Sequence, residues 1–180
     1  MVCIVFDLDN TLVHATKDAF GDADAHPVCD CKLWIHVRPH VRELLLHTKG
    51  IAKIGIWTAG TREYAHEVTV YLASICGVDD VFEFVLSREN ATFYQNMYVK
   101  DLDVVRGLMG IDDVYLVDDS AVHLWAPQNH GRVIQVPPFH YTDDASADCA
   151  LLYLMIQMEV MVRMHNPHSP VPLRPVFSTA

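Results

Sequence analysis

Short apolar runs alternate along the chain with longer amphipathic segments. The apolar runs are rich in β-branched and aromatic residues and have the length of buried strands. They cover residues 2–6, 51–57, 81–86, 113–117 and 132–136. The amphipathic segments predict helices over residues 38–49, 62–76, 101–109 and 145–165. Strands that alternate with helices in this way predict an α/β fold with a mostly parallel sheet and helices on both faces.

Two stretches between these elements lack a clear period. Residues 14–37 contain Gly21, Pro27 and scattered aspartates, and only their last part, Lys32–Val37, has strand character. We interpret this stretch as a short flap inserted after the first strand. Residues 87–99 are predicted to form a loop.

The organisation that follows is one domain with a short tail. We see no internal repeat and no large cap insertion, so we expect a single domain over residues 1–165. Residues 166–180 hold four prolines and are expected to be extended or mobile rather than helical.

Composition narrows the choice of partners and compartment. The chain has 180 residues and a formal net charge of −10, so it is a poor non-specific ligand for nucleic acid or an anionic membrane. The number of cysteines, five, is odd, which favours a reducing compartment. Asp7 interrupts the apolar start of the chain, which argues against a signal peptide. No apolar stretch reaches the length of a membrane span. We therefore expect an intracellular protein, cytoplasmic or nuclear, and a monomer is compatible with the sequence.

Polar side chains fall where the predicted strands end. Asp7 and Asp9 follow the first strand, Thr58 follows the second, and the Asp118-Asp119 pair follows the fourth. The carboxyl ends of parallel strands meet at one edge of the sheet, which is where open α/β sheets bind ligands. Lys100 precedes a predicted helix between two of these strands. Phosphoryl transfer needs such groups: a carboxylate nucleophile, a proton shuttle, a hydroxyl, a lysine and carboxylates for a divalent cation.

The first motif alone is open to two interpretations. Two aspartates separated by one residue can end a strand and cap a loop. They can also act together on a phosphate ester, one as nucleophile and the other as acid–base group, and hold a hard cation. The longer segment Asp-Leu-Asp-Asn-Thr-Leu-Val, residues 7–13, is more specific. It resembles the first motif of the haloacid-dehalogenase (HAD) superfamily of phosphoryl-transfer enzymes.

Further segments extend this resemblance over roughly residues 1–140. They read Arg-Pro-His-Val at 38–41, Trp-Thr-Ala-Gly-Thr-Arg-Glu-Tyr-Ala at 57–65, Tyr-Val-Lys-Asp-Leu at 98–102 and Val-Asp-Asp-Ser at 117–120. Together they resemble one branch of the superfamily, the phosphatases of the RNA polymerase II C-terminal tail and the NLI-interacting-factor-like small phosphatases. That resemblance implies a HAD-like Rossmannoid fold without a large cap domain.

The resemblance also implies catalytic roles. Asp7 would be the nucleophile that forms an aspartyl-phosphate, and Asp9 would protonate the leaving oxygen and then activate water. Thr58 would hydrogen-bond the phosphoryl oxygens, and Lys100 would stabilise the transferring charge while it holds Asp7 and Asp118 close.

A magnesium site is the second implication. Mg²⁺ would be bound by Asp7, by the backbone carbonyl of Asp9 and by a side chain from the Asp118-Asp119 pair. We favour Asp119 as the direct ligand. Many small members of the branch carry asparagine there, so the choice between the two acids stays open.

Substrate contacts are implied for Thr11, Thr58, Ala59 and Arg88. Arg88 could equally be a solvated loop residue. Thr61 departs from some small members, which have an apolar residue lining a pocket for substrate side chains. The expected substrate is phosphoserine or phosphothreonine in a protein such as the RNA polymerase II C-terminal tail, because a site without a large cap suits a bulky ligand.

Other hypotheses were weighed against this one. A small-molecule or nucleotide phosphatase is possible on the same fold. A catalytically inactive binding module, as in mitochondrial import subunits with this fold, would be expected to lack the paired aspartates, and both are present. His26, Cys29, Cys31 and His36 suggest zinc, but their spacing does not suit the common zinc motifs. No cysteine lies in a C-x₅-R loop, which argues against a cysteine-nucleophile phosphatase.

Overall fold

The computed structural model describes residues 1–30, 32–94, 96–142 and 145–165. A five-stranded parallel sheet lies at its centre, in the order β10-β9-β1-β5-β6. The strands are β1 (Val2–Phe6), β5 (Lys53–Trp57), β6 (Phe84–Leu86), β9 (Asp113–Asp118) and β10 (Val133–Gln135). The predicted parallel α/β sheet is confirmed, and the predicted mobile tail lies outside the described residues.

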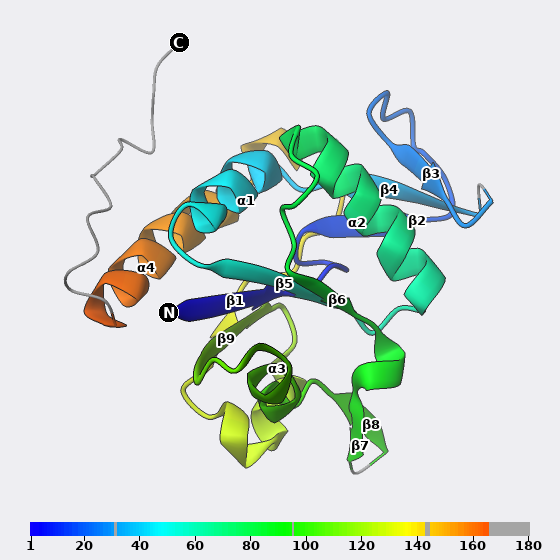
Figure 1. Ribbon diagram of the computed structural model, residues 1–180. Helices are drawn as coiled ribbons and strands as arrows, with labels where there is room; N and C mark the ends of the chain where they lie inside the picture. The colour runs from blue at the N-terminus through cyan, green and yellow to red at the C-terminus, as the bar shows by residue number, and fades with distance from the viewer. Residues whose placement is uncertain (31, 95, 143–144, 166–180) are drawn as a thin grey trace.

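Helices cover both faces of this sheet unequally (Figure 1). Helices α1 (Val41–Lys49), α2 (Arg62–Cys76) and α4 (Ala150–His165) share one face, and α3 (Leu102–Met109) covers the other. The side chains of β1 alternate between the two layers, as a strand's period of two requires. Ile4 and Phe6 pack in the cluster that holds α1, α2 and α4, whereas Cys3 and Val5 pack against α3.

Helix α2 illustrates how local sequence sets these boundaries. It begins after Thr61, whose hydroxyl accepts a hydrogen bond from the backbone N–H of Tyr64 at 3.3 Å. It ends at Gly77, which has φ of 69° and closes the last turn with two backbone hydrogen bonds. The predicted span, 62–76, is therefore confirmed.

Other boundaries differ from the prediction. Helix α1 begins at Val41 rather than Arg38, because His40 has φ of 69° and so cannot continue a right-handed helix. Strand β6 begins at Phe84 rather than Val81, and α4 begins at Ala150 after a short 3₁₀ turn at residues 145–147.

The flap is more regular than its sequence suggested. Strands β2 (Val13–Thr16), β3 (His26–Val28) and β4 (Leu33–Val37) form an antiparallel sheet in the order β2-β4-β3. The predicted irregular stretch, 14–37, was thus wrong except for its last strand. Strands of three or four residues with histidines and a proline among them carry too short a pattern to be recognised.

The predicted loop at residues 87–99 also contains structure. Strands β7 (Thr92–Tyr94) and β8 (Met97–Val99) form a hairpin. All three side chains of β7 are exposed, so no alternation of buried and exposed positions marks it in the sequence.

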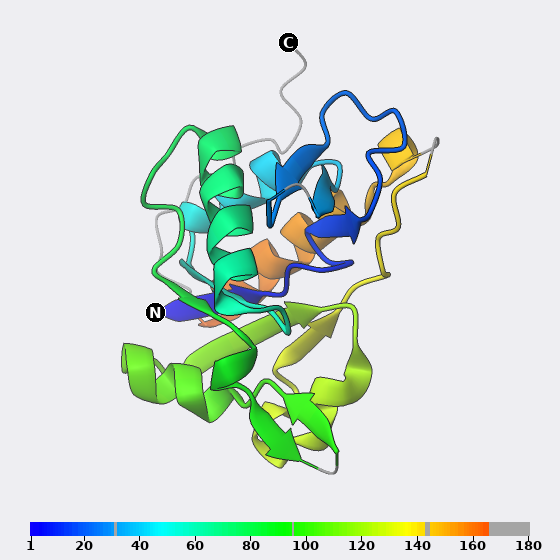
Figure 2. The ribbon, with the colours of Figure 1, turned by 90° about the vertical axis from the view of Figure 1, so that its right-hand side faces the viewer.

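This topology places a site at the ends of β1, β5 and β9. From β1 the chain crosses to β5 on one side and later reaches β9 on the other, and such a reversal of direction marks a ligand-binding crevice. The flap and the β7–β8 hairpin lie at this same edge, on opposite sides of the sheet (Figures 1 and 2). Both can therefore frame what enters the site.

Candidate active site

Lys100 forms the centre of the site. Its ammonium group donates hydrogen bonds to Asp7 Oδ1 and, at 2.7 Å, to Asp118 Oδ2. All three side chains are buried, and they come from positions 93 and 18 residues apart in sequence. Asp7 and Asp118 lie level because β1 and β9 pair in register, Phe6 beside Val117. The predicted convergence of these residues is therefore present.

Charge is unevenly distributed within this buried triad. Burial raises the pKa of Asp7 to about 8, even though the Lys100 ammonium opposes the rise. Burial acts on Asp118 in the same direction, but Lys100 and His123 outweigh it and hold the pKa of Asp118 down at about 2. For Lys100, burial favours the neutral amine, but the two carboxylates dominate and raise its pKa. The lysine therefore stays charged, and Asp118 is its permanent counterion.

Asp9 is held separately, on the side of the site nearest α2. Its Oδ2 accepts a hydrogen bond from Thr58 Oγ1 at 3.1 Å, and its Oδ1 accepts one from the Tyr64 hydroxyl at 2.5 Å. Thr58 Oγ1 in turn accepts the backbone N–H of Gly60 at 2.9 Å. Two hydroxyl donors fix the Asp9 carboxylate beside Asp7 without burying it fully.

No role was predicted for Tyr64, although it lies in the segment 57–65 on which the resemblance to the phosphatase branch partly rests. Its side chain is 6% exposed, and burial followed by the nearby Asp9 charge raises the pKa of its hydroxyl. The tyrosine thus stays protonated and remains a hydrogen-bond donor to Asp9. Nothing in the sequence identifies this contact, because it spans 55 positions.

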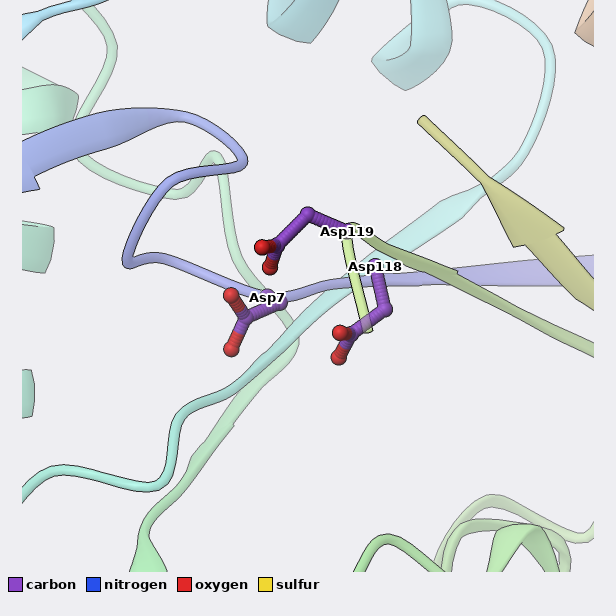
Figure 3. A group of neighbouring side chains, drawn as sticks. All are labelled: Asp7, Asp118 and Asp119. Atoms are coloured by element: carbon purple, nitrogen blue, oxygen red, sulfur yellow. The ribbon is translucent and has the colours of Figure 1, made fainter. Parts of the chain in front are cut away.

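Asp119 completes a group of three carboxylates with Asp7 and Asp118. One oxygen from each lies within 4.8 Å of the others. The Asp119 carboxylate lies beside that of Asp7, and the Asp118 carboxylate lies to the right of both in the view of Figure 3. Burial and the charge of Asp118 both raise the pKa of Asp119. This is the only group of three or more candidate metal ligands in the described part of the chain.

The donor set fits a hard divalent cation. Both oxygens of Asp118 have partners, since Oδ1 accepts the backbone N–H of Ser120 at 2.8 Å and Oδ2 accepts Lys100. Three carboxylates beside one lysine leave an excess of negative charge, which an oxygen-coordinated cation offsets.

The backbone N–H of Asp119 donates to Thr11 Oγ1 at 3.1 Å, which fixes the start of the loop after β9. Thr11 thus contacts the site through this loop.

Arg88 and Ala59 lie together at the mouth of the site. Arg88 Nε donates a hydrogen bond to the Ala59 carbonyl at 2.6 Å. Both residues line a pocket of about 450 Å³ next to Asp9. The remaining wall is formed by the flap and by the start of α2, and it includes Ala15, Cys29, Leu33, Gly60, Thr61 and Tyr64.

His123 and Asn129 are site residues that the sequence did not reveal. The backbone N–H of Lys100 donates to His123 Nδ1 at 3.1 Å, and His123 Nε2 lies 3.2 Å from Asp118 Oδ2. Asn129 Nδ2 donates to the carbonyls of Lys100 and His123, at 2.7 and 2.8 Å. The two side chains come from two 3₁₀ helices after β9, Ala121–Trp125 and Pro127–Asn129, which are too short for a periodic pattern to identify them.

The zinc candidates are not gathered into one group among the described residues. His36 is buried and contacts Thr16 Oγ1 and Asp22 Oδ2 through its two ring nitrogens, at 2.7 and 2.8 Å. His26 stacks on the ring of Tyr71 at 3.8 Å between centroids. Cys31 lies outside the described residues.

A parallel sheet with buried aspartates and a lysine at its carboxyl edge is the arrangement that the resemblance to HAD-type phosphatases predicts. Residues 2–166 match the family of NLI interacting factor-like phosphatases, and the chain belongs to that family. No helix among the described residues is long and apolar enough to cross a bilayer.

Named relatives agree with this assignment. The chain is 30% identical over 173 residues to Phosphatase Herzog of Drosophila melanogaster, covering 93% of this chain and 46% of that protein. It is 32% identical over 173 residues to the human CTD small phosphatase-like protein, covering 93% and 58%. The chain thus spans about half the length of these relatives.

Solved structures agree on the fold. The fission yeast RNA polymerase II CTD phosphatase Fcp1, in a beryllium fluoride complex, superimposes with a TM-score of 0.57 at 20% identity. The match covers 94% of this chain and 52% of Fcp1. At this identity the likeness concerns the fold alone.

Proposed function

We propose that this chain is a Mg²⁺-dependent phosphatase that acts on phosphoserine or phosphothreonine in proteins through an aspartyl-phosphate. The observation that carries the proposal is the placement of two aspartates with different surroundings on one short loop. Asp7 is buried against Lys100, and Asp9 is partly exposed and held by two hydroxyl donors. Paired carboxylates in unlike environments suit separate roles as nucleophile and acid–base group.

In the first step an Asp7 oxygen attacks phosphorus, and the bond from phosphorus to the serine or threonine oxygen breaks. The leaving oxygen takes a proton from Asp9. Both oxygens of Asp9 accept hydrogen bonds here, and a protonated carboxyl keeps acceptor sites beside its O–H, so Thr58 and Tyr64 can hold Asp9 while its proton is aimed at the substrate. Thr58 would donate to a phosphoryl oxygen, the role expected for it, once its hydroxyl turns from Asp9.

In the second step Asp9 removes a proton from water as the water oxygen attacks phosphorus. The bond between phosphorus and Asp7 breaks, which regenerates the carboxylate and releases inorganic phosphate. Lys100 remains charged throughout and stays beside the Asp7 oxygens, where negative charge builds up.

Asp7, Asp119 and the backbone carbonyl of Asp9 are the groups that would hold Mg²⁺. When bound, the cation would offset the charge of the phosphoryl oxygens and favour the ionised form of Asp7. We assign Asp119 rather than Asp118 as the direct ligand. The reason is that Asp118 already accepts hydrogen bonds on both oxygens, whereas the Asp119 carboxylate lies beside that of Asp7.

The shape of the entrance supports a peptide substrate. The pocket next to Asp9 has apolar walls from Ala15 and Leu33 and a cationic rim at Arg88. Such a surface can take an apolar side chain near the phosphate while the arginine contacts the phosphoryl group or the peptide. The names of the relatives, which include CTD small phosphatases, agree with a phosphoprotein substrate.

The test combines metal removal with a substrate panel. Hydrolysis of an aryl phosphate is expected to stop in EDTA and to return with excess Mg²⁺, because only a cation offsets the charge of three carboxylates and a phosphate. Phosphoserine and phosphothreonine peptides are then compared with nucleotide and sugar phosphates by kcat/KM. Full turnover in EDTA contradicts the metal-dependent mechanism, and clear preference for small phosphates favours a small-molecule phosphatase.

A further inference from the structure

The backbone and the ammonium group of Lys100 are held by two residues that also contact each other. Its backbone N–H donates to His123 Nδ1 at 3.1 Å, while its ammonium group donates to Asp118 Oδ2 at 2.7 Å. That same carboxylate oxygen lies 3.2 Å from His123 Nε2. Lys100, Asp118 and His123 therefore form a closed ring of contacts in which the imidazole links the backbone of the lysine to its counterion.

The tautomer of His123 follows from these contacts. A backbone N–H can only donate, so Nδ1 must carry the lone pair. In the neutral ring the proton then lies on Nε2, which faces Asp118 and donates to it. The side chain is about nine-tenths buried or more, at 7% exposed, so water does not compete for either nitrogen.

Asn129 fixes the rest of this arrangement. Its side-chain N–H groups donate to the carbonyls of Lys100 and His123, and its Oδ1 accepts the backbone N–H of Leu102 at 3.0 Å. Its side chain is fully buried. The imidazole is thus attached to a loop that is itself bonded to the start of α3, and it has little freedom to turn.

We propose that His123 is a positioning residue for phosphoryl transfer. It orients Asp118 so that Oδ2 faces Lys100, and it fixes the lysine backbone so that the ammonium group reaches Asp7. His123 acts only through these two residues. The inference rests on the proposed phosphatase activity and adds to it a residue outside the motifs that carry the family resemblance.

Three substitutions at one position separate the two contacts. In His123→Asn the amide oxygen can take the place of Nδ1, which keeps the acceptor for Lys100 and removes the donor to Asp118. In His123→Gln the amide nitrogen can take the place of Nε2, which keeps that donor and removes the acceptor. His123→Leu removes both and keeps an apolar side chain of similar bulk.

The measurement is kcat and KM for an aryl phosphate at saturating Mg²⁺, with the Mg²⁺ activation constant and Tm for each variant. We expect His123→Leu to lower kcat by about tenfold or more, as for a lost hydrogen bond to a charged group. The Asn and Gln variants should each recover part of that loss. KM and the Mg²⁺ activation constant should change by less than about threefold, because His123 contacts neither substrate nor Asp119.

Leu154→Ala in α4 is the matched control, since Leu154 is 3% exposed and lies in the core on the opposite face. It should lower Tm while keeping kcat at a temperature well below Tm. A folded His123→Leu variant with kcat within twofold of the parent overturns the proposal. So does a loss of kcat in Leu154→Ala equal to that in His123→Leu at the same loss of Tm.

A second readout does not depend on activity. Long-range ¹H–¹⁵N correlation spectra of the histidine-labelled chain report which ring nitrogen of His123 carries the proton. A proton on Nε2 is expected, and a proton on Nδ1 overturns the proposal. If the parent chain hydrolyses no phosphate ester, the proposed function fails, while the spectrum still tests the geometry around His123.

Discussion

At the residue scale, two opposing effects act on the pKa of the Asp7 carboxyl group. Burial raises its pKa to about 8, and the Lys100 ammonium counteracts that rise. A nucleophile must be ionised, yet a strongly stabilised carboxylate attacks poorly. A partly compensated buried carboxylate beside a charged lysine meets both needs, provided that a cation supplies the remaining positive charge.

The first prediction concerns this nucleophile. Asp7→Asn should reduce turnover of every phosphate ester to background, because the amide has nearly the same shape but cannot form the covalent intermediate. Circular dichroism should show an unchanged fold. In the parent chain, beryllium fluoride or trapped labelled phosphate should mark Asp7; a mark on any other residue contradicts the assigned roles.

Tyr64 carries the second prediction. Tyr64→Phe removes the hydroxyl that donates to Asp9 Oδ1 at 2.5 Å and leaves the ring in place. We expect kcat for a phosphoserine peptide to fall by about tenfold, the value of one hydrogen bond to a charged group. An aryl phosphate has a better leaving group and needs the acid less, so its loss should be smaller. Equal losses on both substrates would argue against a role through Asp9.

At this scale, the sequence predicted which side chains meet at the edge of the sheet but not those that hold them in place. Asp7, Thr58 and Asp118 each lie at the end of an apolar run, and parallel pairing brings such ends together, while Lys100 precedes helix α3. His123 lies in a 3₁₀ helix of five residues, Ala121–Trp125, which is too short to show a periodic pattern, and its contacts depend on the path of that segment. Residues of that kind become visible only in the structure.

At the scale of the elements, one position in the central sheet requires glycine. Gly55 lies in the middle of β5, between β1 and β6. A Cβ atom at this position would lie 2.1 Å from the ring of Phe84 on β6, far inside contact distance. The ring of Phe84 can therefore lie over β5 only because position 55 carries no side chain.

Gly55→Ala is accordingly the third prediction. The ring of Phe84 must move, so the free energy of unfolding should fall by about 1–3 kcal/mol, as in overpacked cores. Gly107→Ala in α3 is the matched control, since its Cβ meets nothing within 4 Å and alanine favours helix by about 0.4–1 kcal/mol. Urea unfolding of the two variants measures both changes; a stabilised Gly55→Ala would contradict the packing described here.

The helices and the apolar strands of the central sheet could be predicted from the sequence, and most of the short strands outside that sheet could not. Residues 62–76 have enough turns for a helical period to appear, with a hydroxyl cap before and a glycine after. Strands β2, β3, β7 and β8 have three or four residues each, too few to establish a period of two. They are fixed instead by pairing across the flap, as between His14 and His36.

At the scale of the whole molecule, net charge governs encounter with the substrate. A chain with 23 acidic and 13 basic residues does not attract phosphorylated ligands at long range. The positive charge that matters is local, at buried Lys100 and at Arg88 beside the pocket.

The fourth prediction follows from this distribution. Raising salt from about 0.05 to 0.3 M should not lower kcat/KM for a phosphopeptide by more than about twofold, because screening removes no long-range attraction and only weakens repulsion. The same series on an aryl phosphate is the control for effects on chemistry alone. A steep fall with salt for the peptide only would reveal a basic docking surface that the charge balance does not suggest.

The divided origin of the pocket wall has an evolutionary consequence. One side, Ala59 and Gly60, follows the central strand β5, and the other, Ala15, Cys29 and Leu33, belongs to the flap with its own small sheet. Mutations in the flap can thus alter which ester is admitted while the groups that cleave it stay unchanged. Replacing the flap with that of another family member should transfer the substrate selectivity of that member. Proteins of this family can therefore acquire new substrates while their catalytic residues stay the same.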